Sequence, residues 1–392
     1  MQIHSKAVHA GDRKKPGEYT PVTTPISTAA SFYYDSMPQL DRVLGREEPG
    51  YAYARYDNPT NGALEELMSV LEGGHGALAC ASGMAALHAA LVTALGGRRK
   101  SVVAADALYG ASVRLLLNVL EPTGVKIRFA DACDPEAFRE AVAETQPGCI
   151  LVESISNPLL RVAPVDRIAE MAREAGAALV VDSTFATPLI AHPLEMGAHF
   201  SVHSLTKYLA GHGDVLGGVV VTGQEHFDAL RTLGRIIGPV LGPFEAYLTM
   251  RGIKTFPLRM ERQCANASLV ASWLADHPRV ERVHFPGSAT HPDADTIGRL
   301  FPPGLRGAMV SFEIRGAGRE EVFGFMDALK MIVPATSLGD VHSMMLYPAM
   351  SSHREISPAH RERMGIGGNL VRLSVGIEDA GDIIADLEQA LG

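Results

Sequence analysis

The sequence predicts an α/β protein with a large domain around a mostly parallel sheet and a smaller C-terminal α+β domain. From about residue 61 to residue 222, short apolar runs alternate with segments whose apolar residues recur at helical spacing, a rhythm typical of βαβ units. After Glu225 the alternation stops, and a helical stretch rich in arginine precedes widely separated strands. The 392 residues, 46% hydrophobic and 20% charged, are typical of a globular chain of roughly two to three domains.

The expected strands of the large domain are apolar runs bounded by turn-forming residues. They cover residues 101–105, 126–130, 149–153, 177–182, 200–203 and 217–222. The segments between them that carry helical spacing cover residues 83–95, 110–120, 134–144 and 166–175. In the smaller domain we expect helices over residues 244–271 and 380–391 and strands over residues 308–314 and 371–375.

The first sixty residues lack long periodic segments and are rich in turn formers, as in the stretches 20–25 and 48–50. We therefore expect an extended arm, which needs another surface to pack on because it has no core of its own. The expected division of the chain is an arm of residues 1–60, an α/β domain of residues 61–250 and an α+β domain of residues 251–392.

Charge and hydropathy limit the classes of function. The 35 basic and 44 acidic side chains leave a formal net charge of -9 at pH 7 and a pI near 5.9, which offers no basic surface for nucleic acid or an anionic membrane. The apolar runs are far shorter than the ~20 residues of a membrane-spanning helix, and the first residues do not form a secretory signal. We expect a cytoplasmic protein that acts on small molecules.

The cysteines and histidines do not predict a metal site. The cysteines are widely spaced without a C-x-x-C pair, a pattern typical of isolated thiols in a reducing compartment. His199 and His203 straddle a strand-like run and have no carboxylate at ligand spacing. We assign no metal.

Polar side chains follow two of the expected strands at the point where each strand ends. One strand ends in Asp182, and the next is followed by Ser204, Thr206 and Lys207. Ligands of open α/β sheets bind at the carboxyl ends of the strands. A lysine amine can form a Schiff base with an aldehyde, and a carboxylate can keep a pyridine nitrogen protonated. The two together predict a site for pyridoxal 5'-phosphate (PLP).

A PLP site also needs donors for the phosphate group. The hydroxyls of Ser204 and Thr206 supply some, and Ser82, Gly83 and Met84 lie where a helix is expected to begin, so their backbone N–H groups supply others. Taken singly, a lysine after a strand is usually a solvated surface residue, and an aspartate there is often a helix cap. The segment around Gly83 lacks the further glycines of a dinucleotide site, which argues against NAD.

The stretch from Ser204 to Gly218, S-L-T-K-Y-L-A-G-H-G-D-V-L-G-G, resembles the lysine signature of the PLP-dependent enzymes of cysteine and methionine metabolism, the transsulfuration family. This family includes cystathionine γ-lyase, methionine γ-lyase, cystathionine γ-synthase and homoserine-ester sulfhydrylases, and the resemblance spans nearly the whole chain. It implies an aspartate-aminotransferase-like fold, fold type I, in which Lys207 binds the cofactor covalently. It also implies a homotetramer built from active dimers.

Further segments resemble those that form the family's active site. Tyr53 and Arg55 match the arm residues that reach the cofactor phosphate of a neighbouring subunit, so the arm is expected to contact that subunit. Tyr109 matches the tyrosine that stacks on the pyridine ring and moves protons near the leaving group. Asn157 matches the residue that hydrogen-bonds the phenolic oxygen of the cofactor, and Asp182 matches the partner of its pyridine nitrogen.

The smaller domain supplies the substrate side of the site by the same resemblance. Arg372, on an expected strand, matches the arginine that binds the substrate α-carboxylate, and a guanidinium can bind a carboxylate with two parallel hydrogen bonds. Ser337 matches the loop that lies over the same carboxylate, although a polar turn is the simpler interpretation of that loop by itself.

Some positions depart from family members of known substrate. Methionine γ-lyases have a cysteine where this chain has Ala111, and a Lys-Asp pair where it has Gly234 and Arg235. Cystathionine-handling members have a glutamate where this chain has His342. Arg235 is either a partner for the distal carboxylate of a long substrate or a surface arginine, and the role of His342 is open.

The resemblance implies γ-elimination from a sulfur amino acid, as in cystathionine γ-lyase, with a 2-oxo acid, ammonia and a thiol as products. Lys207 would remove the α-proton, and Tyr109 would protonate the leaving sulfur. The shared residues leave open γ-replacement, as in cystathionine γ-synthase or an O-acylhomoserine sulfhydrylase, and methionine γ-elimination. A binding protein without catalysis is disfavoured, because Lys207, Asp182, Tyr109 and Arg372 are all present.

Overall fold

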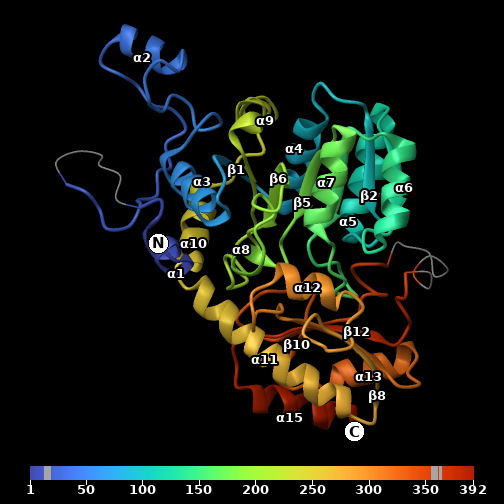
Figure 1. Cartoon of the computed structure of the whole chain (residues 1–392). Helices are drawn as coiled ribbons and strands as arrows, with labels where there is room; N and C mark the ends of the chain where they lie inside the picture. The colour runs from blue at the N-terminus through green and yellow to red at the C-terminus, as the bar shows by residue number, and fades with distance from the viewer. Residues whose placement is uncertain (13–18, 355–360, 362–363) are drawn as a thin grey trace.

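The computed structural model describes residues 1–12, 19–354, 361 and 364–392. Its larger sheet has seven strands in the order β1–β7–β6–β5–β4–β2–β3 (Figure 1). The strands are β1 (Gly76–Cys80), β2 (Ser101–Ala105), β3 (Lys126–Ala130), β4 (Cys149–Glu153), β5 (Ala178–Asp182), β6 (Phe200–Ser204) and β7 (Gly218–Thr222). Four of the six pairings are parallel, and β7 is antiparallel to both of its neighbours. The predicted mostly parallel sheet is confirmed.

The predicted strands of this sheet agree with the observed bounds to within one residue. Strands β2, β4 and β7 are buried along their whole length, which is why each is a continuous apolar run. Strand β1 was not predicted. Its sequence, G-A-L-A-C, has no β-branched or aromatic residue to distinguish it from a helix or a loop.

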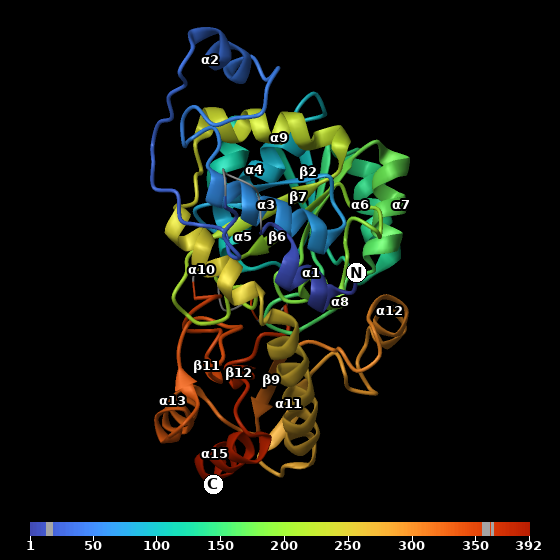
Figure 2. The same ribbon diagram turned by 90° about the vertical axis from the view of Figure 1, so that its left-hand side faces the viewer.

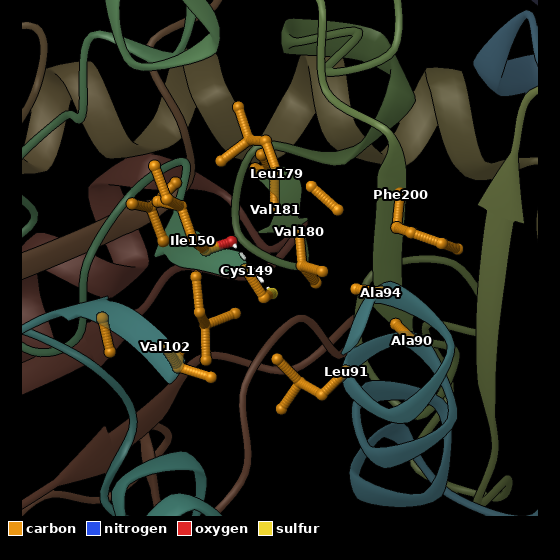
Figure 3. Packing of buried hydrophobic residues seen from close by; sticks show 14 of the residues in the cluster. Ala90, Leu91, Ala94, Val102, Cys149, Ile150, Leu179, Val180, Val181 and Phe200 are labelled. Carbon is orange, nitrogen blue, oxygen red and sulfur yellow. Dashed lines mark hydrogen bonds between the residues drawn. The ribbon is translucent and has the colours of Figure 1, made fainter. Parts of the chain in front are cut away.

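Helices α3 (Pro59–Glu72) and α4 (Gly83–Leu95) cover opposite faces of this sheet. Val219 and Val221 of β7 pack in one hydrophobic cluster with residues of α3, whereas Val220 packs in another with residues of α4. Alternation of side chains along a strand produces this division. Figure 3 shows part of the cluster that contains Val220 and α4. In it, Ala90, Leu91 and Ala94 of α4 lie near strand residues, namely Val102, Cys149, Ile150, Val180 and Phe200.

The other helices of the larger part connect the strands or cover them. They are α5 (Gly110–Arg114), α6 (Pro135–Thr145), α7 (Val165–Ala175), α8 (Thr187–Ile190) and α9 (Gln224–Ile237). The helix predicted over residues 110–120 is observed as α5 followed by one π-helical turn, Leu115–Leu120.

The smaller sheet has five strands in the order β10–β11–β12–β9–β8. They are β8 (Val280–His284), β9 (Met309–Ile314), β10 (Val333–Pro334), β11 (Met344–Leu346) and β12 (Leu370–Ser374), and the helices around them are α11 (Phe256–Asp276), α12 (Ala294–Leu300), α13 (Arg319–Ala328) and α15 (Ala380–Leu391). The helix predicted over residues 244–271 is two helices, α10 (Pro243–Ile253) and α11, because Pro257 lies in the first turn of α11 and favours a new helix start there.

One hydrophobic cluster joins the two sheets and fixes the loop after β6. Tyr208 and Leu209, which follow Lys207, pack in this cluster with Phe256 of α11 and with Met309 and Leu338 from the C-terminal part of the chain. The residues next to Lys207, Tyr208 and Leu209, are therefore buried between the larger and the smaller sheet. A residue in such a place is held rigidly, as a reacting group requires.

The N-terminal segment contains two short helices, α1 (Ile3–His9) and α2 (Met37–Leu44). Helix α1 packs on α3 and α11, but α2 and the chain around it stand away from the body of the molecule (Figures 1 and 2). Tyr33 and Met37 in this part are 88% and 73% exposed. Large apolar side chains with so little cover are typical of a surface that meets another chain.

None of the helices in the described ranges combines the length and the apolar character that crossing a bilayer requires.

Candidate active site

A cavity of about 460 Å³ lies at the carboxyl ends of β4, β5 and β6 and is bordered on its other side by residues of the smaller sheet. Ten of the predicted site residues line it: Ser82, Gly83, Met84, Tyr109, Asn157, Asp182, Ser204, Thr206, Lys207 and Arg372. All of them come from the larger part of the chain except Arg372, which lies on β12.

Two carboxyl groups lie side by side at the ends of adjacent parallel strands. Glu153, the last residue of β4, is in register with Asp182, the last residue of β5. The Oδ1 atom of Asp182 accepts hydrogen bonds from the backbone N–H of Thr184 at 3.0 Å and from its hydroxyl at 2.6 Å. Burial raises the pKa of both carboxyls, and Asp182 raises the pKa of Glu153 further. A cation beside Asp182 would therefore be stabilised.

Lys207 follows β6, and its Nζ donates a hydrogen bond to the Oγ of Ser337 at 3.0 Å. Burial, with a further contribution from the Arg372 guanidinium, lowers the pKa of Lys207 to about 8. Roughly a tenth of this amine is then neutral at pH 7, compared with fewer than about one in a thousand for an ordinary lysine. Lys207 can therefore serve as a nucleophile or a base.

Arg372 is held from two sides at the cavity wall. Its Nη1 donates to the Oδ1 of Asn157 at 2.7 Å, and its Nη2 donates to the carbonyl of Ser337 at 3.3 Å. The residue is 2% exposed, and burial lowers the pKa of Arg372 to about 10. Its Nε has no hydrogen-bond partner among the described residues. A buried donor of this kind favours a carboxylate ligand in the cavity.

The start of α4 forms the opposite end of the cavity. The Ser82 side chain caps this 13-residue helix. A Cβ at Gly83 would lie 2.9 Å from the Cβ of Ser204, and a Cβ at Gly218 would lie 2.3 Å from the carbonyl oxygen of Ser82. The glycines thus let two chain segments meet where backbone N–H groups and serine hydroxyls converge, an arrangement that suits an anion such as phosphate.

These features fit PLP. The aldehyde needs an amine such as Lys207, the phosphate needs the donors at the start of α4, and the pyridine nitrogen needs a carboxylate. Asp182 accepts its hydrogen bonds from Thr184, a neutral residue. Its charge is thus available to a protonated ring nitrogen.

Tyr53 and Arg55 do not line this cavity. The Arg55 guanidinium lies 5.5 Å from the centre of the Tyr53 ring and 4.8 Å from that of Tyr56, and it donates to the carbonyl of Arg235. Within one chain, therefore, the arm does not bring these two residues to the predicted cofactor site.

Arg235 and His342 also lie outside the cavity wall. Arg235 and Arg231 both pair with the carboxylate of Asp57, Arg235 at 2.6 Å. The Nδ1 of His342 lies 3.2 Å from the Oδ1 of Asp340, and its side chain is 66% exposed.

The cavity wall also contains residues that were not predicted from the sequence. Arg114, the last residue of α5, lines it, as do Glu153, Thr184 and Phe185. The sequence did carry a signal for Thr184, because this hydroxyl lies two residues after Asp182, the last residue of its strand. Arg114 carried no signal, since a single arginine on a helix is usually solvated.

The sheet, the lysine and the carboxylate at its strand ends define the class of protein, a PLP-dependent enzyme with the aspartate-aminotransferase-like fold. Residues 4–392 match the family described as Cys/Met metabolism PLP-dependent enzyme, and the chain belongs to this family. The predictions of the family, the fold class and the cofactor are confirmed.

Relatives of the chain carry out different reactions within this family. The chain is 40% identical to the L-methionine γ-lyase of Pseudomonas putida, over 99% of this chain and 96% of that one. It is 41% identical to the cystathionine γ-lyase of Bacillus subtilis (strain 168), over 88% and 89% of the two chains. The crystal structure of cystathionine γ-synthase from Xanthomonas oryzae pv. oryzae, in complex with aminoacrylate and cysteine, superposes with a TM-score of 0.92 at 36% identity, covering 100% of this chain and 98% of that one.

Proposed function

We propose that this protein is a cystathionine γ-lyase, which converts L-cystathionine and water into cysteine, 2-oxobutanoate and ammonia. The observation that carries the proposal is the make-up of the cavity wall, where Lys207, Asp182 and Tyr109 lie together with two arginines, Arg372 and Arg114. Two guanidinium groups in one cavity favour a substrate with two carboxylates. Cystathionine has two, whereas methionine has one.

When bound, PLP supplies an electron sink that stabilises negative charge at the substrate Cα. Ser82, Gly83, Met84, Ser204 and Thr206 would hold its phosphate, and Asp182 would face its ring nitrogen. Arg372 would bind the substrate α-carboxylate. Its guanidinium is already oriented by the Oδ1 of Asn157 at 2.7 Å and by the Ser337 carbonyl at 3.3 Å, so little freedom is lost when substrate binds.

Lys207 and Tyr109 would move the protons. The neutral Nζ of Lys207 would take a proton from the substrate Cα, and a second proton would leave Cβ, so that the electrons of that C–H bond can expel the sulfur from Cγ; Ser337, at 3.0 Å, orients the amine. Tyr109 donates a proton to the γ-sulfur as the carbon–sulfur bond breaks. Tyr109 lines the cavity and is 42% exposed, so its phenol would be accessible to the distal half of a long substrate.

The alternative is γ-replacement, in which a thiol takes the place of the group that leaves Cγ, so that no 2-oxo acid is released. The residues of the cavity wall are the ones that this reaction would also need. The similarity to a cystathionine γ-synthase structure supports keeping this alternative beside γ-elimination.

The test is release of 2-oxobutanoate from L-cystathionine by the purified, PLP-loaded protein without added thiol. We expect continuous release, measured as the 2-oxo acid, together with one cysteine per turnover. Failure to release the 2-oxo acid, combined with product formation from O-succinyl-L-homoserine and cysteine, would replace γ-elimination with γ-replacement.

Replacing Arg114 by methionine should separate cystathionine from methionine as substrates. Loss of one charge-assisted hydrogen bond costs about 1.5–3 kcal/mol, so kcat/KM for L-cystathionine should fall about 10- to 100-fold, while kcat/KM for L-methionine should change little. The control is Arg299→Met, because the guanidinium of Arg299 pairs with Asp166 outside the cavity. An equal loss for both substrates would contradict recognition of the distal carboxylate.

We also propose a homotetramer built from active dimers, in which each arm supplies Tyr53 and Arg55 to a neighbouring site. Support comes from the position of these two residues outside the wall of their own cavity and from exposed apolar side chains such as Ile236 and Phe244, which are 74% and 56% exposed. Sedimentation equilibrium should give a mass four times the chain mass of 41.8 kDa. A monomer mass would contradict the proposal.

The proposed division of the chain remains an arm of residues 1–60, a PLP-binding domain of residues 61–250 and a C-terminal domain of residues 251–392. The two sheets, each with its own helices, support it. We propose a cytoplasmic location, which the four unpaired cysteines favour. Separation of the cytoplasmic and secreted fractions of the source cells, followed by detection of the protein, would check this.

A further inference from the structure

Glu153 is a buried acidic residue that has no task in the proposed reaction. It is 8% exposed and ends β4. It lines the main cavity and also a second cavity of about 170 Å³, whose wall includes Asp106, Asp131 and Arg161. Glu153 is therefore part of the partition between the two cavities, directly behind the site of reaction.

The Glu153 carboxyl contacts the backbone of two proposed site residues. Its Oε1 accepts a hydrogen bond from the backbone N–H of Tyr109 at 2.6 Å. The backbone N–H of Asn157 also donates a hydrogen bond to the carboxyl. Tyr109 directly precedes α5, so this bond fixes the chain where that helix starts. Because the Tyr109 side chain is 42% exposed, packing alone does not determine where its ring lies.

Space on the other side of Tyr109 is also restricted. A Cβ at Gly110 would lie 2.4 Å from the carbonyl oxygen of Ser352, so the start of α5 lies against this loop. The backbone of Tyr109 is thus held between the Ser352 loop and the end of β4. The contact on the β4 side is the hydrogen bond from Tyr109 to Glu153.

We propose that Glu153 is a positioning residue, which fixes the backbone of Tyr109 so that the phenol lies beside the leaving group of the substrate. This inference rests on the proposed role of Tyr109 as the acid that protonates the departing sulfur. It adds a residue that acts on the reaction without touching the substrate.

The chemistry of the pair Glu153 and Asp182 indicates which substitutions test this role. Burial raises the pKa of Glu153, and the adjacent Asp182 raises it further, so the neutral form of Glu153 is favoured. A neutral carboxyl still accepts the Tyr109 N–H through its carbonyl oxygen. Glutamine has the same shape and keeps one carbonyl oxygen that can accept the Tyr109 N–H, whereas aspartate is one methylene shorter and moves the acceptor away from Tyr109.

The experiment is a double-mutant cycle on the PLP-loaded enzyme with L-cystathionine as substrate. We expect Glu153→Gln to keep kcat within about threefold of the parent. Glu153→Asp should lower kcat about 10- to 100-fold, the range expected for misplacement of a reacting group, with KM changed less than about threefold. In the Tyr109→Phe background, where no phenol remains to be positioned, Glu153→Asp should cost less than about twofold.

Asp386 supplies a matched control. It is also buried, at 6% exposed, and accepts hydrogen bonds from the backbone N–H groups of Lys330, Met331 and Ile332, none of which lines the cavity. Asp386→Asn should lower the thermal midpoint without changing kcat, and its effects should add to those of Tyr109→Phe. Far-UV circular dichroism and the absorbance of bound PLP check that each variant folds and binds the cofactor.

Each other outcome has a defined meaning. If the effects of Glu153→Asp and Tyr109→Phe multiply, Glu153 does not act through Tyr109 and the inference is overturned. Glu153→Gln tests the contact even when the aspartate variant does not fold. If Glu153→Gln lowers kcat as much as Tyr109→Phe does, the inference is also overturned. An unchanged kcat in Tyr109→Phe overturns the acid role of Tyr109 and the inference with it. If the parent does not turn over L-cystathionine, only the proposed reaction fails, and the cycle is run with O-succinyl-L-homoserine and cysteine.

Discussion

Replacing Lys207 by alanine is expected to lower turnover of L-cystathionine by at least about 1,000-fold. The substitution removes the amine that would bind the cofactor aldehyde and take the α-proton, and general base catalysis alone contributes about 100- to 10,000-fold. Among the described residues that line the cavity, Lys207 is the only lysine, so no neighbouring amine is placed to replace it. The measurements are kcat for release of 2-oxobutanoate and the absorbance of PLP retained after gel filtration.

Lys330→Ala is the control, because this lysine is exposed and lies outside the cavity wall. It should retain the parental kcat and the parental absorbance. Full turnover by Lys207→Ala, with the cofactor absorbance unchanged, would show that the site has been placed on the wrong residue.

Asp182→Asn is expected to lower kcat by about 100-fold or more, with the fold preserved. An asparagine Oδ1 can still accept both hydrogen bonds from Thr184, at 3.0 and 2.6 Å. The substitution therefore removes the charge and little else. Loss of a fixed charge that stabilises charge in the transition state typically costs 100- to 1,000-fold, on the order of 3–4 kcal/mol. The measurements are kcat, the absorbance of bound PLP and far-UV circular dichroism.

The same variant should show the cost of burying this carboxylate. Burial raises the pKa of Asp182 in the folded protein above its unfolded value, so the folded state binds more protons. Stability of the PLP-free protein should then fall as the pH rises through the folded pKa, and Asp182→Asn should unfold at a higher temperature than the parent at pH 7. Asp134→Asn, at the exposed cap of α6, should change neither property. A lower midpoint for Asp182→Asn would contradict this account.

The predicted sheet shows which physical signals a sequence carries. Strands buried on both faces, such as β2 and β4, are continuous runs of branched or apolar residues and were located to the residue. β1 pairs with β7 through its backbone, and its small side chains carry no β signal. β10 and β11 are only two and three residues long and depend on tertiary contacts.

The site residues likewise divide into those that the sequence predicts and those that depend on tertiary packing. Asp182 and Lys207 were found because each follows a strand end, a position that topology brings to one edge of the sheet. Arg114 and the contact between Glu153 and Tyr109 depend on where the start of α5 lies relative to the end of β4, which no spacing in the sequence encodes. The arm residues Tyr53 and Arg55 were recognised by resemblance alone.

The paired carboxyls at the ends of β4 and β5 also bear on how long the protein survives. Without the cationic ring nitrogen of the cofactor, two buried acidic groups lie next to each other, which destabilises their charged forms. PLP should bind the site of the folded chain more tightly than the unfolded chain, so it should stabilise the folded state by an amount that grows with the logarithm of the excess of free PLP over its dissociation constant. Binding of PLP should therefore raise resistance to heat and to proteases, and protein freed of PLP should unfold at a lower temperature than PLP-loaded protein.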